Sequence, residues 1–495
     1  MIATASTLLD ATTSAYGLIA IGVFTIAYLL VISEDLTKLR KSKPVLAAAG
    51  LMWILVALFY NGLAHPPAPT LEQRLMHHVA EFGALFMFLM VAMTYITAIS
   101  QHNLFLKINA MLVSAGLGFR AVFWVTGVLS FLISPIADNL TTALLMGAVV
   151  VTVGQGNKRF ISLACINVVV AANAGGAFSP FGDITTLLVW QMGKVPTQEF
   201  SALVLPSLVN WLGPAAIMHF AVPRDKPAPL EAEVHLVPGW QVITGLFLCT
   251  IATAVVFHAV LHLPPFLGMT TGLGYFFAYG HVRRLREHRL GHEQPIDVFH
   301  HVREVEWDTL LFFFGVIICV GALSELGYLA AASTLMYDPA GPIGPYWANV
   351  SVGILSAVID NVPVMFAVLR MDPVMAQDPA GSLYQWLLVT LSAGVGGSLL
   401  SVGSAAGVAL MGTAHGTYTF VRHLKWTPVI ALGFAASIAT HAWLNAPEPV
   451  SATDPAPAPS DPPRIEAPSH EEPGPDPHEL SIPSDHRSRA SAESR

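Results

Sequence analysis

Long apolar runs recur along most of this chain, and they leave few folds open to it. The first covers residues 17–32 and the last covers residues 428–444. Of the 495 residues, 54% are hydrophobic and only 11% are charged, and the mean hydropathy is +0.60. A helix needs about 20 apolar residues to cross a bilayer, and helices satisfy their own backbone hydrogen bonds there. These features predict an all-α polytopic membrane protein.

Further candidate spans differ widely in length. They cover residues 45–60, 79–99, 119–133, 140–153, 160–172, 184–192, 203–222, 237–260, 266–280, 309–326, 347–358, 363–369, 386–400 and 405–411. Several are too short to cross alone and are flanked by Gly, Pro, Asp or Asn. Irregular backbone at membrane depth is tolerated only against protein or a watery cavity, so these segments predict broken helices and re-entrant hairpins.

Two basic segments orient the chain in the membrane. Lys38, Arg40, Lys41 and Lys43 follow the first run, and a second basic segment covers residues 283–289. Lys and Arg concentrate in cytoplasmic loops, so the amino terminus is expected outside. No basic region precedes the first run and no small-residue cleavage pattern follows it, so we expect it to span rather than to be removed. A bacterial inner membrane is the simplest location.

Two acidic motifs embedded in apolar sequence indicate a duplication. Ser-Pro-Ile-Ala-Asp-Asn at 134–139 resembles Ser-Ala-Val-Ile-Asp-Asn at 356–361, and the two Asp residues are 222 positions apart. The glycine pairs at 175–176 and 396–397 are 221 positions apart, and Glu81 and Glu306 are 225 apart. A charge at membrane depth is costly and marks a functional site by default. A pair of interrupted segments at matching positions indicates a transporter with inverted repeats, although parallel repeats fit this pattern too.

The repeat divides the chain into five predicted regions. These are N-terminal transmembrane helices (1–74), transport repeat 1 (75–222), connecting helices with a cytoplasmic basic loop (223–299), transport repeat 2 (300–445) and a tail (446–495). The tail is rich in Pro, Asp, Glu and Ser and has almost no large apolar residue. It cannot bury enough surface to fold, so we expect it to be disordered.

The duplicated motif supplies the first candidate cation ligands. Proline frees backbone carbonyls, while Asp, Asn, Ser and Thr offer the hard oxygen atoms that small cations prefer. A simple helix kink capped by the Asp side chain is the alternative, but the repetition favours an ion site. The candidates are Ser134, Asp138, Asn139 and Thr141 in the first half and Ser356, Asp360 and Asn361 in the second.

Glycine-rich segments supply the second set. Asn173, Asp183, Thr185 and Thr186 lie in or just after Asn-Ala-Gly-Gly-Ala-Phe-Ser-Pro-Phe-Gly, where a new apolar run begins. An N-cap at Asp183 is compatible with an ion-binding role. The counterpart keeps its glycines and hydroxyls but has no acid, and it adds Ser398 and Ser401. The two halves are therefore expected to be asymmetric.

A third set of ionisable residues lies near the expected span ends. These residues are His77, Glu81, Glu306 and Asp308. They are candidates for a proton relay, since histidine titrates near neutral pH, but interfacial residues are also common anchors.

Several long motifs in order resemble the NhaD-type sodium:proton antiporters of the ion transporter superfamily. They are Ser-Pro-x-Ala-Asp-Asn-Leu-Thr-Thr-Ala-Leu at 134–144, the segment 173–186, Asp-Asn-Val-Pro at 360–363, Gly-Gly-Ser-Leu-Leu-Ser-Val-Gly-Ser-Ala-Ala-Gly at 396–407, and His-Leu-Lys-Trp-Thr-Pro at 423–428. The similarity extends from about residue 15 to 445. It implies inverted repeats with hairpins and broken helices, a homodimer, and exchange of cytoplasmic Na+ or Li+ for external protons.

The mechanism we expect is competition for shared carboxylates. Burial disfavours the ionised form of a carboxylate and a bound cation favours it, so proton and cation exclude one another. Asp138, Asp183 and Asp360 are the expected metal-ion ligands and proton carriers. No cofactor and no nucleic acid is expected, because the transported ions and the lipid bilayer are the only partners that the sequence indicates.

Three other classes remain to be weighed. An ion-coupled anion carrier for carboxylates or arsenite is disfavoured, because the segments 134–144, 173–186, 356–363 and 396–407 contain three acids and no Lys or Arg. An intramembrane aspartyl protease needs two carboxylates that share a proton, whereas each repeated Asp stands beside an Asn. A purely structural membrane scaffold would not explain why acidic residues are duplicated within apolar sequence. The sequence therefore favours a secondary transporter over an enzyme.

Overall fold

The computed structural model describes most of the chain up to Pro447. The described residues are 10–37, 39–63, 69–104, 106–107, 110–111, 116–154, 156–226, 235–289, 298–338, 341–414 and 416–447. The tail predicted to be disordered lies, apart from residues 446–447, outside these ranges.

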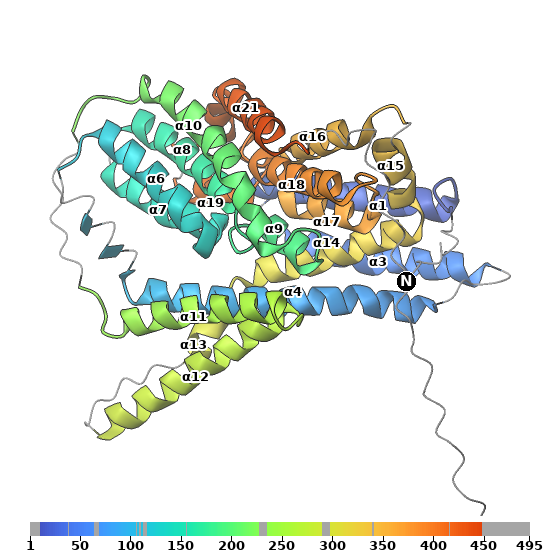
Figure 1. Ribbon diagram of the computed structural model, residues 1–495, viewed down its shortest axis with the longest axis horizontal. Coiled ribbons are helices and arrows are strands. Elements are labelled where there is room, and N and C mark those ends of the chain that lie inside the picture. Colours follow the sequence, from blue (N-terminus) through green and yellow to red (C-terminus); the bar gives the residue numbers. More distant parts are fainter. Residues whose placement is uncertain are drawn as a thin grey trace, which may run out of the picture. The chain divides into compact units, whose positions relative to one another are not determined.

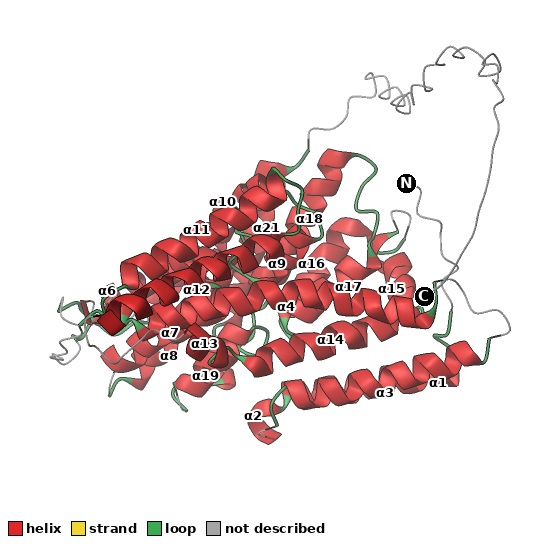
Figure 2. Cartoon of the chain, turned by 90° about the horizontal axis from the view of Figure 1, so that it is seen from below, coloured by secondary structure: helices red, strands yellow, loops and turns green. Residues whose placement is uncertain are grey.

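All regular structure within the described ranges is helical, as the sequence predicts (Figures 1 and 2). Nine helical stretches there are long and apolar enough to cross a membrane. This is an integral membrane protein. The first half contains α1 (Ala15–Ile32), α2 (Glu34–Thr37), α3 (Ser42–Asn61), α4 (Leu71–Gln101), α6 (Phe119–Ala137), α7 (Asn139–Val153), α8 (Lys158–Gly176), α9 (Ile184–Gln191), η1 (Thr197–Leu203) and α10 (Val204–His219).

The connecting region and the second half are also helical. They are α11 (Trp240–Ala259), α12 (Pro265–Arg289), α13 (Val298–Arg303), α14 (Trp307–Glu325), α15 (Tyr328–Tyr337), α16 (Gly344–Ser356), α17 (Asn361–Met371), α18 (Pro379–Gly396), α19 (Ala405–Thr413), α20 (Phe420–Leu424) and α21 (Thr427–Asn445).

Helices α6 and α7 form a hairpin whose tip is Asp138, and both pack on α8 (Figure 1). Pro135 lies in the last turn of α6 and cannot donate a backbone hydrogen bond. Asp138 has a φ of 59°, a left-handed value that reverses the chain. Phe119, at the start of α6, stacks on Phe160 near the start of α8, so α7 returns to the end at which α6 began. The predicted break is therefore a hairpin tip.

The second half repeats this arrangement with α16, α17 and α18. Ser134 donates to the Ala172 carbonyl at 2.6 Å, and Ser356 donates to the Ala393 carbonyl at 2.8 Å. Each bond ties the end of the hairpin's first helix to the helix that follows the hairpin. These matched contacts support the predicted duplication.

Glycines allow the same helices to approach closely. A Cβ atom on Gly175 would lie 2.4 Å from the Phe131 carbonyl oxygen, and one on Gly396 would lie 2.1 Å from the Gly353 oxygen. Small residues at such crossings bring backbones together without a hydrophobic driving force. Gly175 and Gly396 therefore lie at close helix crossings, the role predicted for the two glycine pairs.

Helices α4 and α14 occupy corresponding positions in the two halves and run antiparallel. Arg74, at the start of α4, pairs with Glu325 at the end of α14 at 3.0 Å. Phe82 packs on Phe314 farther along, with ring centroids 5.0 Å apart. Opposite directions are what inverted repeats require. The full inverted relation between the halves stays a prediction.

Candidate functional site

Asp183 lies where the two halves meet. It is the N-cap of α9, and one of its oxygens, Oδ1, accepts a hydrogen bond from the backbone amide of Thr185 at 3.0 Å. Its other oxygen, Oδ2, accepts one bond from the Asn139 side-chain amide at 2.9 Å and another from Asn361 at 2.8 Å. The two asparagines follow the acids of the repeated motif. A single carboxylate therefore receives one amide from each hairpin tip.

Asp138 is bound by residues of its own hairpin. Its carboxylate accepts hydrogen bonds from the Thr141 backbone amide and from the Thr141 hydroxyl, both at 2.8 Å. This is the N-cap geometry for α7, which the sequence left as an alternative to ion binding. The cap uses both oxygens once and leaves each of them a further lone pair.

Asp360 has no comparable cap. It precedes α17, but its side chain makes no capping hydrogen bond, and its buried Oδ1 atom has no hydrogen-bond partner. A buried polar atom without a partner is costly, by about 1–3 kcal/mol. Among the three candidate acids in the described residues, Asp360 is the one with an unused buried oxygen.

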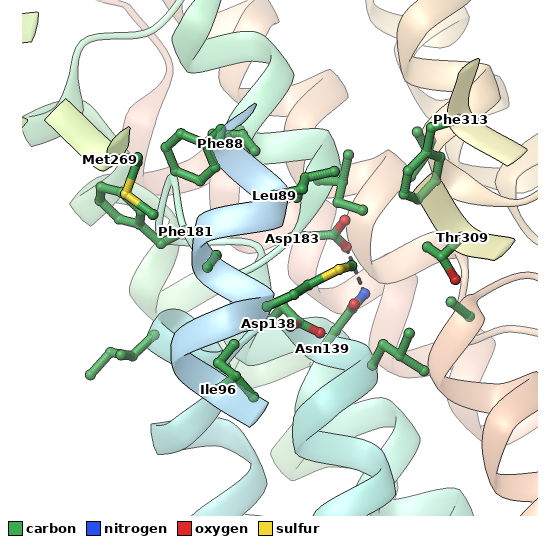
Figure 3. Close-up of a pocket in the computed structure, with 18 of the residues that line it drawn as sticks. Phe88, Leu89, Ile96, Asp138, Asn139, Phe181, Asp183, Met269, Thr309 and Phe313 are labelled. Atoms are coloured by element: carbon green, nitrogen blue, oxygen red, sulfur yellow. Dashed lines mark hydrogen bonds between the residues drawn. The ribbon is translucent and has the colours of Figure 1, made fainter. Parts of the chain in front are cut away.

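All three acids line one cavity, which we call the central cavity (Figure 3). Its volume is about 50 Å³, and Asn139, Asn361 and Thr309 also line it. Figure 3 shows Asp183 and Asn139 beside α4, with Asp138 below Asp183 and Thr309 across the cavity. A space of this size admits a few water-sized groups. No Lys or Arg is among its described lining residues.

The three acids do not converge on one point. No group of three His, Cys, Asp or Glu side chains in the described part of the chain is arranged to hold a metal ion. The cation ligands would therefore include amide, hydroxyl and carbonyl oxygens beside the carboxylates, which suits a weakly held, exchangeable ion.

Three more of the predicted residues extend this network. Asn139 also donates to the Asn173 side-chain oxygen at 3.0 Å, and Asn173 donates to the Ser404 hydroxyl at 3.0 Å. The Thr186 hydroxyl donates to the Asp183 carbonyl at 2.7 Å. Thr185 is fully buried, and its hydroxyl has no partner. Ser404 is not among the ligands predicted from the sequence, although it lies in the matched glycine segment 396–407.

Two predicted ligands bond away from the acids. The Ser398 hydroxyl donates to the Val395 carbonyl at 2.6 Å within the same turn. The Ser401 hydroxyl contacts the Met411 sulfur at 3.3 Å. Neither residue lines the central cavity.

The predicted relay residues separate into two groups. His77 lies 3.2 Å from Glu81, which forms an ion pair with Arg370 at the end of α17. Glu306 and Asp308 lie at the start of α14, where Trp307 packs on Phe86 of α4, about 8 Å beyond Glu81 by helix rise. Asp308 accepts a hydrogen bond from Ser42 of α3.

Glu306 has a direct relation to the central cavity. It accepts a hydrogen bond from the Thr309 hydroxyl at 3.1 Å, and Thr309 lines that cavity. Glu306, Glu304, Thr141 and Asp138 also line a second cavity of about 410 Å³, the Glu306 cavity. Asp138 belongs to both cavities.

Lys41 lies near the site although its sequence position does not predict it. It lies above the Phe312 ring, 4.7 Å from its centroid, and it lines a further cavity of about 50 Å³ together with Glu34 and Asp360, the Lys41 cavity. In the sequence, Lys41 belongs to a basic loop and is sufficiently explained by the positive-inside rule. Its position near Asp360 is visible only in the folded structure.

Comparisons with known proteins show the family to which the chain belongs. Residues 18–394 match a family model described as "Citrate transporter". The chain is 52% identical to the Na+/H+ antiporter NhaD of Alkalimonas amylolytica, over 88% of this chain and 92% of the relative. It is 52% identical to the Vibrio cholerae NhaD (88% and 94% covered) and 55% identical to that of Vibrio parahaemolyticus (80% and 98% covered). The chain belongs to the NhaD family of Na+/H+ antiporters.

Proposed function

We propose that this protein is a secondary active antiporter that exchanges cytoplasmic Na+ or Li+ for external protons. The observation that carries the proposal is the meeting of both hairpin tips on Asp183, through Asn139 and Asn361, in a cavity that Asp138 and Asp360 also line. The names of the relatives supply the ions. The exchange needs no cofactor, since Na+ or Li+ enters only as the transported ion.

Competition for the acids would couple the two ions. A carboxylate with a bound cation is held ionised, whereas a protonated carboxyl cannot balance the charge of a cation. Asp183 links the halves, so a change in its charge alters hydrogen bonds to both hairpins at once. Asp138 and Asp360, at or beside the two tips, supply further oxygens to the passing ion.

The cavities indicate how ions reach the site. The Glu306 cavity leads to Asp138, and the Lys41 cavity leads to Asp360. Lys41 belongs to a loop that the positive-inside rule places in the cytoplasm, and Glu306 lies where α14 begins after the second basic segment. Both approaches therefore lie on the cytoplasmic side. This arrangement supports a conformation that faces the cytoplasm.

Ion pairs cover the opposite side of the site. Arg370 pairs with Glu81, and Arg74 pairs with Glu325 at 3.0 Å. These pairs join α17 of the second hairpin to α4, and α4 to α14. Alternating access would require the α17 contact to open as one element rocks against the other. Glu81 would then belong to a gate, while Glu306 remains the better proton-relay candidate.

The size and charge of the central cavity argue against the anion carrier. A site for a carboxylate or arsenite anion would need cationic groups, and no described lining residue of the central cavity is Lys or Arg. Its volume of about 50 Å³ admits a small cation with little of its hydration shell. The homodimer implied by the superfamily stays a prediction.

Everted membrane vesicles test the proposed exchange. After respiration acidifies the vesicle lumen, Na+ or Li+ is added across a range of pH and the pH gradient is followed by a fluorescent dye. We expect Na+ or Li+ to collapse the gradient with the wild-type protein and not with Asp138→Asn at equal membrane levels. Wild-type vesicles that hold inserted protein and respond to no cation would overturn the proposal.

Lys41 should weaken cation binding at Asp360. A positive charge beside the site opposes a second one, and at an effective dielectric constant near 20 this costs on the order of 1 kcal/mol at moderate separation. We therefore expect Lys41→Gln to lower the Na+ concentration for half-maximal exchange about fivefold. Lys43→Gln, in the same basic segment, is the control. An unchanged or higher Na+ requirement in Lys41→Gln would show that its charge does not act on the site.

A further inference from the structure

A basic cavity lies apart from the transport site, between the two halves. It is an open cavity of about 360 Å³, bordered by the start of α8, the segment after α10, α20 and the residues that lead into α21. Four cationic side chains line it, together with Ser162 and Trp426: Lys158, Arg159, Arg422 and Lys425. We call it the basic cavity.

Among the described residues, the four positive charges of this cavity have no acidic counterpart. No Asp or Glu is among its described lining residues, and none of the four cations forms an ion pair with a described carboxylate. Arg422 donates to the Thr417 carbonyl, which fixes its position without neutralising it. Like charges repel one another at close range, so an anion between them would be favoured.

Apolar side chains surround the basic cavity. Phe220, next to the lining residue Ala221, is 80% exposed, and Val421 and Leu424, on either side of Arg422 and His423, are 62% and 45% exposed. Trp426 is partly buried at the cavity, the position typical of aromatic residues at the boundary between lipid headgroups and acyl chains. A free aqueous anion would need the cations but not this apolar border.

The charges also place the cavity in one leaflet. The Lys and Arg residues of short loops lie on the cytoplasmic side, where anionic lipids attract basic residues by about 1 kcal/mol each near the surface. Basic pockets between transmembrane helices on that side bind anionic headgroups. We infer that the basic cavity binds the phosphate headgroup of an anionic phospholipid, whose acyl chains lie along Phe220, Val421 and Leu424.

Such a lipid would join the two halves near the transport site. Helix α8 of the first half leads directly into the segment that carries Asp183, and α20 belongs to the second half. His423 of α20 contacts the Ser398 carbonyl at 2.9 Å, beside the break between α18 and α19. The bound headgroup should therefore stabilise the folded protein. This inference does not depend on which ion is transported.

Lipid-dependent thermal stability tests the inference. The full chain is purified in a neutral detergent, and its unfolding midpoint is measured with increasing phosphatidylglycerol, phosphatidylcholine or inorganic phosphate. We expect phosphatidylglycerol alone to raise the midpoint. In Arg159→Gln/Lys425→Gln, the lipid concentration for half of this increase should rise about tenfold or more.

A matched pair of exposed arginines supplies the control. Arg284 and Arg286 of α12 also lie in a basic segment, and Arg284→Gln/Arg286→Gln should respond to phosphatidylglycerol as the wild type does. The comparison uses the lipid-dependent increment, so a lower starting midpoint in a variant does not obscure it. Equal stabilisation by inorganic phosphate, or an equal loss of response in both variants, would overturn the inference.

Discussion

Asp183→Asn is expected to abolish Na+-dependent proton exchange while the protein still inserts into the membrane. An amide side chain neither gains nor loses a proton at physiological pH, and it cannot balance the charge of a bound cation. Its NH2 group would also face, or compete with, the amides of Asn139 and Asn361, which now donate to Asp183 at 2.9 and 2.8 Å. Exchange in everted vesicles should fall to the level of vesicles without the protein.

The stability cost of this substitution should be limited. Hydrogen bonds to a charged group contribute about 1.5–3 kcal/mol each, and relief of the buried charge offsets part of that loss. Glu199→Gln, which neutralises an exposed acid at η1, is the control and should exchange Na+ as the wild type does. Residual exchange above a tenth of the wild-type rate in Asp183→Asn would contradict a central role for Asp183.

Gly396→Ala is expected to lower the stability of the folded protein markedly. The new Cβ atom would lie 2.1 Å from the Gly353 carbonyl oxygen, and backbone cannot move aside as a flexible side chain can. Overpacking of this kind costs about 1–3 kcal/mol and sometimes more. Helices α16 and α18 would have to separate beside the second hairpin. Thermal unfolding in detergent should show a clearly lower midpoint and a smaller folded fraction.

Gly245→Ala separates this effect from a general effect of glycine replacement. Gly245 lies within α11, and a Cβ atom there meets nothing within 4 Å. Alanine also favours helix over glycine by about 1 kcal/mol, so this variant should be as stable as the wild type or more so. If the two variants unfold at the same temperature, close packing at Gly396 does not support the fold.

The sequence predicts the local features of this molecule well. Pro135 and Asp138 indicate where a helix must break, and Gly175 and Gly396 indicate close helix crossings, because each effect depends on the residue's own backbone. The spacing of the motifs alone predicts a duplication. The acidic motifs likewise predict a site at membrane depth, since a charge there is costly.

The sequence does not predict the contacts between distant segments. Asn361 donates to Asp183 across 178 positions, and no periodicity or spacing links them. From the sequence, Lys41 is interpreted as a signal for membrane orientation, whereas in the folded protein it lines a cavity together with Asp360. A motif also predicts where a residue lies but not the direction of its side chain. Ser398 is an example, because its hydroxyl donates to the Val395 carbonyl of the preceding turn.

Proton release on Na+ binding tests the central claim most directly. Na+ is added to the purified protein in a nearly unbuffered solution, with choline as the control cation, and the pH change is recorded. If cation and proton compete for the same carboxylates, Na+ should release protons from the wild-type protein and not from Asp138→Asn/Asp183→Asn. Na+ binding to the wild type with no release of protons at any pH would contradict the account.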